Sequence, residues 1–163
     1  MAITNENDHF VVPPRNDGYL VSTEPARLDI QMIHQYLSEE SYWAKNIPYE
    51  VVQKSIAHSF CFGVYYHDKQ VGLARLVTDK ATFAYLCDVF ILEGHRGKGL
   101  SKWLLSIIHA HPDLQGLRRW MLGTRDAHGL YAQFGWAPLP EEVVPRFMQF
   151  HNPDVYAMPN AKR

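Results

Sequence analysis

A glycine-rich turn with two basic residues is the part of this sequence whose residue types and spacing best suit chemistry. Residues 94–101 read Gly-His-Arg-Gly-Lys-Gly-Leu-Ser, between an apolar run and a strongly amphipathic stretch. The first N–H groups of a helix lack partners and carry partial positive charge, and glycines let that backbone approach an anion. Arg96 and Lys98 add cationic donors, and Ser101 adds a hydroxyl. The segment therefore predicts a socket for a phosphate or diphosphate.

The spacing of this turn differs from two common nucleotide-binding loops. The pattern Gly-x-x-x-x-Gly-Lys-Ser/Thr is absent, and the glycines do not match Gly-x-Gly-x-x-Gly. The turn instead resembles the pyrophosphate-binding motif of the GNAT acetyltransferases, Gln/Arg-x-x-Gly-x-Gly/Ala. Arg96, Gly99 and Ser101 hold its defined positions, and Ser101 departs mildly from the small residue expected there.

A second segment, residues 127–136, is similar to the other signature of that family, in which a tyrosine is followed by Gly-Phe. Tyr131 holds the tyrosine position, and Trp136 stands in place of the phenylalanine. The family's asparagine before this tyrosine is missing, and Thr124 or Asp126 occupies its neighbourhood. One contact to the pantetheine arm therefore has no clear donor here.

The resemblance implies that acetyl-CoA is the cosubstrate and that its acetyl group passes directly to a primary amine in a ternary complex. It also implies a splayed, often bulged strand whose main chain serves the pantetheine amides and the thioester oxygen. No metal site is expected, since a helix would put His109 and His111 on different faces. The coenzyme contacts implied are Val89, Phe90, Ile91, Arg96, Gly97, Lys98, Gly99, Leu100, Ser101, Thr124 and Tyr131.

Tyr131 is the candidate general acid. In the family, a tyrosine at this place lies by the coenzyme sulfur and protonates the leaving thiolate. Helical spacing puts Tyr131 on one face with Ala127, Leu130 and Phe134, so its ring is expected to point inward. A tyrosine on an apolar helix face more often serves packing, and that alternative stays open.

Asp88 is the candidate general base, because it is a carboxylate within the otherwise apolar run 83–92. An acceptor amine with a reference pKa of about 10.4 must lose a proton before it attacks, and desolvated carboxylates commonly accept protons. A carboxylate tied to an arginine or to backbone is an open alternative. His128 and His34 are weaker candidates, and a water relay would need no side-chain base.

Tyr42 and Trp43 are the candidate acceptor-binding residues. They lie in the connection between the first two expected helices, which usually shapes the acceptor pocket in the family. Their rings could hold an amine through cation–π contact, or they could simply close the edge of the core.

The elements that must position these residues follow from hydrophobic spacing. Their order predicts a mixed α/β layered domain. The resemblance implies the GNAT fold, a central, mostly antiparallel sheet of about six to seven strands flanked by about four helices. Strands are expected at 19–22, 59–66, 71–78, 82–92, 119–124 and 147–150, and helices at 25–37, from Pro48, at 100–111 and, capped by Asp126, at 127–134.

Composition limits the function classes. The 163 residues carry a net charge of -1, with 47% hydrophobic residues, two cysteines and no long charged run. We therefore expect an N-terminal arm over 1–18 and a single domain over 19–163, with no nucleic-acid face, no membrane span and a cytoplasmic location. The partner is expected to be a small-molecule amine or peptide acceptor, and a homodimer is left open. The alternatives are a non-catalytic coenzyme A sensor on the same fold and a protein that binds another phosphorylated ligand.

Overall fold

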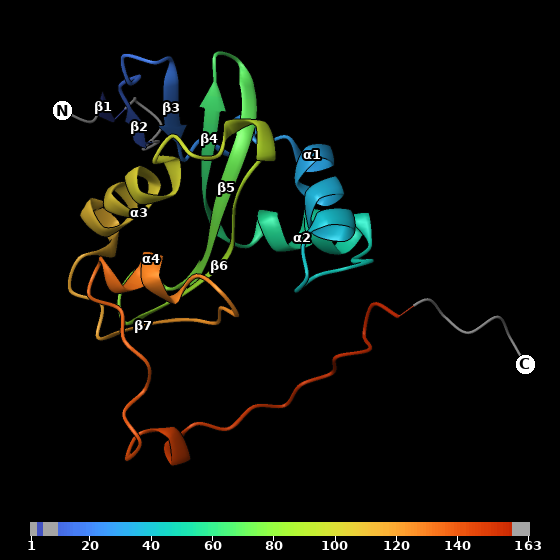
Figure 1. Ribbon diagram of the computed structural model, residues 1–163, viewed down its shortest axis with the longest axis vertical. Coiled ribbons are helices and arrows are strands. Elements are labelled where there is room, and N and C mark those ends of the chain that lie inside the picture. Colours follow the sequence, from blue (N-terminus) through green and yellow to red (C-terminus); the bar gives the residue numbers. More distant parts are fainter. Residues whose placement is uncertain (1–2, 5–9, 158–163) are drawn as a thin grey trace, which may run out of the picture.

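A seven-stranded sheet with helices on both faces forms the body of the protein (Figure 1). The computed structural model describes residues 3–4 and 10–157. The strands lie side by side in chain order, and each neighbouring pair is antiparallel except β6 and β7, which run parallel. The expected mixed, mostly antiparallel sheet is thereby confirmed. The strands are β1 (Ile3–Thr4), β2 (Phe10–Val12), β3 (Tyr19–Ser22), β4 (Phe60–Tyr66), β5 (Lys69–Thr78), β6 (Phe83–Ile91) and β7 (Arg119–Leu122).

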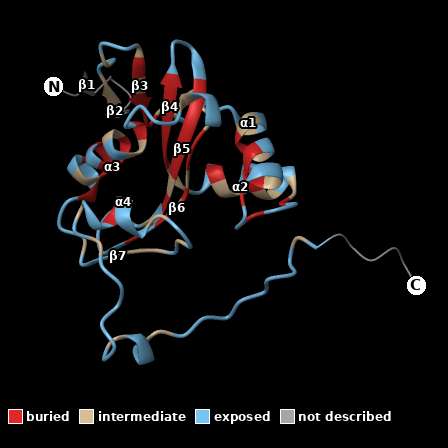
Figure 2. Ribbon diagram, viewed as in Figure 1, coloured by how far each residue is buried: buried red, intermediate tan, exposed pale blue. Residues whose placement is uncertain are grey.

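Four α-helices cover the two faces of this sheet. α1 (Ile30–Gln35) and α2 (Tyr49–Ala57) pack on one face, while α3 (Leu100–Ala110) and α4 (His128–Ala132) pack on the other (Figure 1). α3 has one apolar face that packs on the sheet, since its apolar residues recur at helical spacing and the side chains on that face are buried (Figure 2). Because α3 makes the crossover between the parallel strands β6 and β7, its first turn lies at the end of β6.

The strands β6 and β7 pair over only part of their length. Phe83 to Leu86 pair with Arg119 to Leu122. Beyond Leu86, β6 continues to Ile91 with β5 as its partner on one side and no partner on the β7 side. In the same stretch, the register of β6 against β5 shifts at Asp88, whose φ of 49° lies in the left-handed region. This is the bulge that the resemblance implied, and it leaves main-chain groups after Leu86 without a strand partner on the β7 side.

Several details differ from the expectations. The helix expected at 25–37 is split, because the side chain of Asp29 accepts a hydrogen bond from the Met32 N–H and starts α1 there. A π turn, Tyr36–Glu40, then extends it. The α4 cap expected from Asp126 is wrong, because the Thr124 hydroxyl accepts the hydrogen bond from the Ala127 N–H instead.

The strand expected at residues 147–150 is also wrong. Residues 137–157 hold no strand, and they extend away from the body with a single short 3-10 turn, Val144–Arg146 (Figure 1). Two further strands that the sequence did not predict, β1 and β2, lie at the other edge of the sheet, where β2 pairs with β3 and β1 pairs with β2. None of the helices in the described part of the chain is long and apolar enough to cross a membrane.

Candidate functional site

The glycine-rich turn has the open backbone that an anion would need. Gly97 and Gly99 have φ of 75° and 71°, and Gly99 is the N-cap residue of α3. A Cβ at either glycine would meet no protein atom within 4 Å, so the space above the turn is free for a ligand. The turn and the first residues of α3 line a cavity of about 290 Å³, which also includes Ile91 and, from α4, Leu130. The expected anion socket therefore has both its helix N-terminus and the room to fill it.

The Arg96 side chain connects this turn to neighbouring elements through two hydrogen bonds. Its Nε donates to the main-chain oxygen of Ile91 at 2.9 Å, and its guanidinium donates to the Tyr36 hydroxyl at 3.3 Å. Tyr36 in turn stacks on Phe90 with ring centroids 3.8 Å apart. The side chain therefore ties the turn to β6 and to the first helical layer. Arg96 and Lys98 are both exposed.

Arg15 reaches the same turn from the other end of the chain. Its guanidinium donates to the Lys98 main-chain oxygen at 3.2 Å, pairs with Asp17 and lies 5.3 Å from the Trp103 ring centroid. Sequence reasoning missed this residue, because it lies far from the turn along the chain and no local motif marks it. It adds a further cation, with a side chain 30% exposed, beside the candidate anion site.

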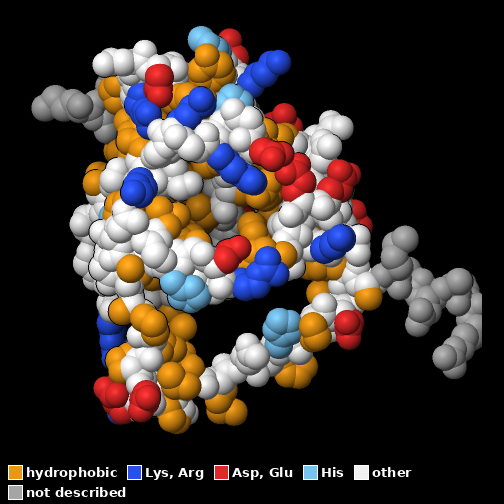
Figure 3. Space-filling view, in the orientation of Figure 1, with side chains coloured by type: hydrophobic (Ala, Val, Ile, Leu, Met, Phe, Trp, Pro, Cys, Tyr) orange, Lys and Arg blue, Asp and Glu red, His pale blue; other side chains and the backbone are white. Residues whose placement is uncertain are grey.

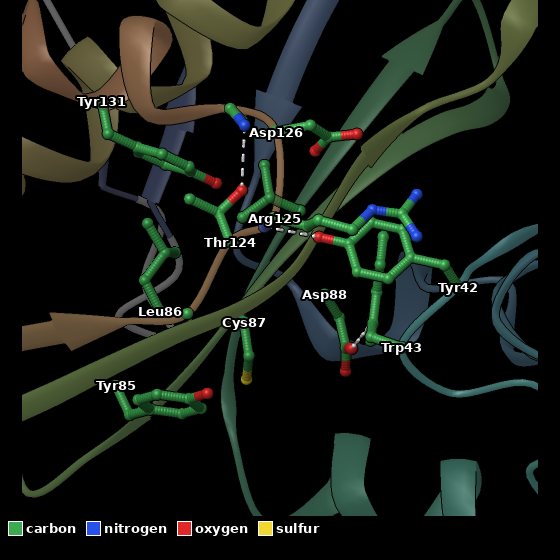
Figure 4. A pocket seen from close by; sticks show the side chains of 13 residues that line it. Tyr42, Trp43, Tyr85, Leu86, Cys87, Asp88, Thr124, Arg125, Asp126 and Tyr131 are labelled. Atoms are coloured by element: carbon green, nitrogen blue, oxygen red, sulfur yellow. Dashed lines mark hydrogen bonds between the residues drawn. The ribbon is translucent and has the colours of Figure 1, made fainter.

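A second cavity, of about 330 Å³, opens where β6 and β7 separate (Figure 4). It brings together Tyr42 and Trp43 from the first helical layer, Asp88 from the bulge, and Thr124 and Tyr131 from beyond β7. Tyr42 and Trp43 are the residues expected to bind the acceptor, Asp88 and Tyr131 are those expected to move protons, and Thr124 is an expected coenzyme contact. The remaining lining residues are Tyr85, Leu86, Cys87, Val89, Gly123, Arg125, Asp126 and Ala127.

Asp88 is held by two donors at the floor of this cavity. One carboxylate oxygen accepts from Arg75 Nε at 2.7 Å, and the other accepts from Trp43 Nε1 at 2.9 Å (Figure 4). Its side chain is 8% exposed and that of Arg75 is 17% exposed, so the ion pair is largely desolvated. The tie to an arginine is the alternative that the sequence left open for this residue. The two hydrogen bonds also fix a non-glycine residue at positive φ.

Tyr131 lies at the wall between two cavities. Together with Gly123 and Thr124 it lines both the cavity beside Asp88 and a neighbouring one of about 340 Å³ towards Trp136. Burial raises the pKa of the Tyr131 hydroxyl to about 12. The hydroxyl therefore carries its proton at neutral pH, and in Figure 4 it points towards Thr124 across the cavity.

Tyr42 joins the first helical layer to the loop after β7. Its hydroxyl accepts a hydrogen bond from the Arg125 N–H at 3.0 Å, and the Arg125 guanidinium lies 3.9 Å from its ring centroid. Trp43 meets Tyr42 edge to face at 5.0 Å. The two rings form one wall of the cavity and fix the distance between its two sides.

The other histidine considered as a base, His34, lies outside this cavity. Its Nε2 is 3.0 Å from the main-chain oxygen of Ile47, and its ring meets Tyr49 edge to face. His128 lines only the neighbouring cavity towards Trp136. Neither ring lines the cavity that holds Asp88.

Comparison with known proteins agrees with this geometry. The model of the acetyltransferase (GNAT) family matches residues 30–136, which include the glycine-rich turn and the cavity that holds Asp88. A protein of Gibberella zeae, provisionally named as an acetyltransferase, is 37% identical over 148 residues, covering 76% of this chain and 82% of the relative.

Solved structures show the same arrangement of elements. A Xanthomonas campestris protein, provisionally named as a GNAT acetyltransferase, is 50% identical, with a TM-score of 0.82 over 86% of this chain and 97% of its own. A GNAT family acetyltransferase from Elizabethkingia anophelis, solved with acetyl-CoA bound, has 15% identity and a TM-score of 0.53 over 73% of this chain and 76% of its own. That second likeness concerns the fold alone.

Proposed function

Because the chain belongs to the GNAT family of acetyltransferases, we propose that it transfers the acetyl group of acetyl-CoA directly to a primary amine in a ternary complex. One observation carries this proposal. The glycine-rich turn and the cavity around Tyr131 lie along the stretch of β6 that has no partner on the β7 side. This stretch contributes Ile91 to the first and Val89 to the second. An elongated ligand in which a pantetheine arm joins a diphosphate to a thioester matches this arrangement of sites.

The coenzyme would be held mainly by main chain. The free N–H groups at the start of α3, with Lys98 and Arg15, suit the diphosphate. The main-chain groups of residues 87–91 that face the β7 side, where they have no strand partner, suit the amides of the pantetheine arm and the developing charge on the thioester oxygen. These groups are fixed before the ligand arrives, so little reorganisation is needed.

In the transfer step, the nitrogen lone pair of the amine attacks the thioester carbon, and the carbon–sulfur bond breaks. We assign the proton that the leaving sulfur takes up to the Tyr131 hydroxyl, since this group is protonated and lines the cavity. Asp88, held by Arg75 and Trp43, would orient the ammonium form of the acceptor between Tyr42 and Trp43. The ammonium gives one proton to water before it attacks. The nitrogen loses a second proton after the attack, and water returns that proton to the Tyr131 oxygen, so the products are the amide, the coenzyme thiol and one released proton.

Direct transfer also fits the cysteine in the cavity. Burial raises the pKa of the Cys87 thiol to about 12, and a thiol in that state is a poor nucleophile. An acetyl-cysteine intermediate is therefore not expected.

The proposal is tested by following free thiol release and product mass with acetyl-CoA and a panel of polyamines, amino acids and peptides. Binding is tested separately by thermal shift with acetyl-CoA, ATP and NAD. At a hundredfold excess over its Kd, a ligand adds about 2.7 kcal/mol, or roughly 5–10 °C in Tm for a chain of this size. A shift with ATP alone would reject coenzyme binding, whereas a shift with acetyl-CoA without acetylation of any amine would favour a non-catalytic coenzyme sensor.

A further inference from the structure

Residues 137–157, here called the C-terminal arm, leave the body after α4 and run outside it (Figure 1). Two large apolar side chains of the arm, Met148 and Phe150, are 97% and 103% exposed. Single apolar residues are common on protein surfaces. Two such side chains without cover in one short extended segment indicate a contact that this arrangement of the arm does not make.

The arm is tethered to its own chain at two points. The Arg119 guanidinium of β7 lies 4.7 Å from the Phe147 ring centroid. Further along the arm, Tyr156 packs against the buried cluster of α1 and α2. Figure 3 shows an opening between the arm and the rest of the molecule. Residues 148–155 are therefore an exposed loop between two contacts with the same molecule.

Both tethers lie on the same face of the sheet. The cluster of α1 and α2 includes Leu73 of β5, so this is the face that these two helices cover. Val77 lies four residues further along β5 and pairs with Tyr85, which places both side chains on the face of Leu73. Phe83 and its partner Arg119 share that face, because Phe83 lies two residues before Tyr85. The exposed loop therefore begins and ends on the α1 and α2 side of the sheet.

Three apolar residues on this side of the sheet are left partly uncovered by the helices. Val77, Phe83 and Tyr85 are 46%, 36% and 41% exposed, and we call them the open sheet face. The open sheet face adjoins one tether, since Arg119 pairs with Phe83. The molecule thus carries an apolar loop and an apolar surface on the same side, and neither is covered in the arrangement seen here.

We propose that the arm closes over the open sheet face of its own chain and buries Met148 and Phe150 there. The chain itself supplies the occupant of this face, because both tethers join the arm to that chain. Closure moves the loop between the tethers towards the sheet. Burial of the apolar side chains favours the closed arrangement, and the ordering of the loop opposes it.

Closure would add two residues to the acceptor site. Tyr85 belongs both to the open sheet face and to the cavity that holds Asp88. An arm that covers Tyr85 forms the outer wall of that cavity, so Met148 and Phe150 would contact the acceptor and keep water from it. The open arrangement is the one that admits the acceptor. This role in turnover rests on the proposed function, whereas closure itself does not.

The first experiment tests closure by a disulfide between the arm and the sheet. A chain with Val77→Cys and Phe150→Cys is oxidised at low protein concentration, and the linked peptides are identified by mass spectrometry after trypsin digestion. Trypsin separates residues 76–80 from both native cysteines, Cys61 and Cys87, so the disulfide can be assigned to Val77→Cys. Circular dichroism checks that each variant is folded.

The matched control is Val77→Cys with Gln149→Cys, because Gln149 and Phe150 lie on opposite sides of an extended segment. A disulfide within one chain should form severalfold faster in the Phe150→Cys variant than in the control, since the two Cβ atoms must approach closely. Equal rates in the two variants, no disulfide at all, or a disulfide that joins two chains would each overturn the proposal.

The second experiment measures turnover. Met148→Ser with Phe150→Ser should raise the KM for the amine about fivefold or more, because apolar contacts with the acceptor are lost, and should leave the KM for acetyl-CoA unchanged. Met148→Leu with Phe150→Leu keeps apolar side chains and should restore the KM for the amine. Gln149→Ser with His151→Ser is the control and should keep both KM values of wild type.

The same KM for the amine in the Met148 and Phe150 serine variant and in the control would overturn the assignment of the arm to the acceptor site. If no amine is acetylated by wild type, the proposed function fails instead, and the disulfide rates still decide whether the arm closes.

Discussion

Tyr131 is the residue on which the proposed proton transfer depends. It is 8% exposed, its pKa is raised to about 12 by burial, and it lines the cavities on both sides of the α4 start. Sequence reasoning could place this ring on the inner face of a helix, but it could not separate packing from catalysis. The ring belongs to the buried core cluster and also lines both cavities, so packing and the proposed proton transfer are compatible in this residue.

Tyr131→Phe should therefore lower kcat by about 10² to 10⁴, the usual contribution of a general acid. The Kd for acetyl-CoA should change by less than about threefold, since the ring and its packing are kept. Single-turnover kinetics and calorimetric titration measure the two quantities. Equal kcat values in the two proteins would leave Tyr131 with a packing role only. Because the pKa is about 12, wild type should show no alkaline loss of kcat from this group below about pH 10.

Cys87 gives the complementary prediction. Its thiol lines the cavity, but burial raises its pKa to about 12, so the reactive thiolate is scarce. Cys87→Ala should keep kcat within about threefold of wild type, and no acetylated protein should be found by mass spectrometry after incubation with acetyl-CoA alone. A thousandfold loss of kcat, or a stable acetyl-enzyme, would instead indicate a covalent route.

At the scale of the elements, hydrophobic spacing and glycines were sufficient to predict the parts that build the site. The apolar spacing of residues 100–111 and the turn before it correctly predicted α3 and its N-terminus. The helix expected at 25–37 was predicted less well, because the cap at Asp29 starts α1 inside the segment that the apolar pattern had assigned to one helix. The contacts of Asp88 could not be predicted, since Arg75 and Trp43 come from other elements and nothing local marks them as its partners.

The start of α3 allows a matched test of the diphosphate site. Gly99 has a φ of 71°, where an alanine costs roughly 1–2 kcal/mol, and its Cβ would enter the free space above the turn. Gly99→Ala should lower Tm by a few degrees and weaken acetyl-CoA binding about tenfold or more. Gly94→Ala is the control, because Gly94 lies in the same turn without a positive φ and also has free space around it. Equal affinity for acetyl-CoA in the two variants would rule out close approach of the ligand at Gly99.

The far end of α3 makes the fold sensitive to acid. Burial lowers the pKa of both His109 and His111 from the ordinary 6.5. His109 Nε2 accepts the hydrogen bond of the Trp136 indole at 3.0 Å, and buried His111 Nε2 has no partner among the described residues. The unfolded chain thus binds protons more readily than the folded one in the pH range below about 6.5.

The free energy of unfolding should therefore be highest, as far as these histidines are concerned, above about pH 7. It should fall as the pH drops through 6.5, by at most about 1.4 kcal/mol per pH unit for each histidine. Urea unfolding at a series of pH values measures this. His111→Phe should reduce the slope, because a phenylalanine fits beside Phe10, Phe60 and Phe62 and takes up no proton. Asp113 raises and Lys80 lowers the pKa of His111, so the two charges oppose each other. If His111→Phe leaves the slope unchanged, the acid sensitivity belongs to other groups.

At the scale of the whole molecule, the sequence was a good guide to the body and a poor one to the arm. The apolar residues Phe147 and Phe150 suggested a strand, but a strand forms only where a neighbour supplies hydrogen bonds and cover. Residues 148–150 lie off the body and have neither. The same reason explains why Arg15 was missed, because its role comes from a contact with Lys98 across the fold.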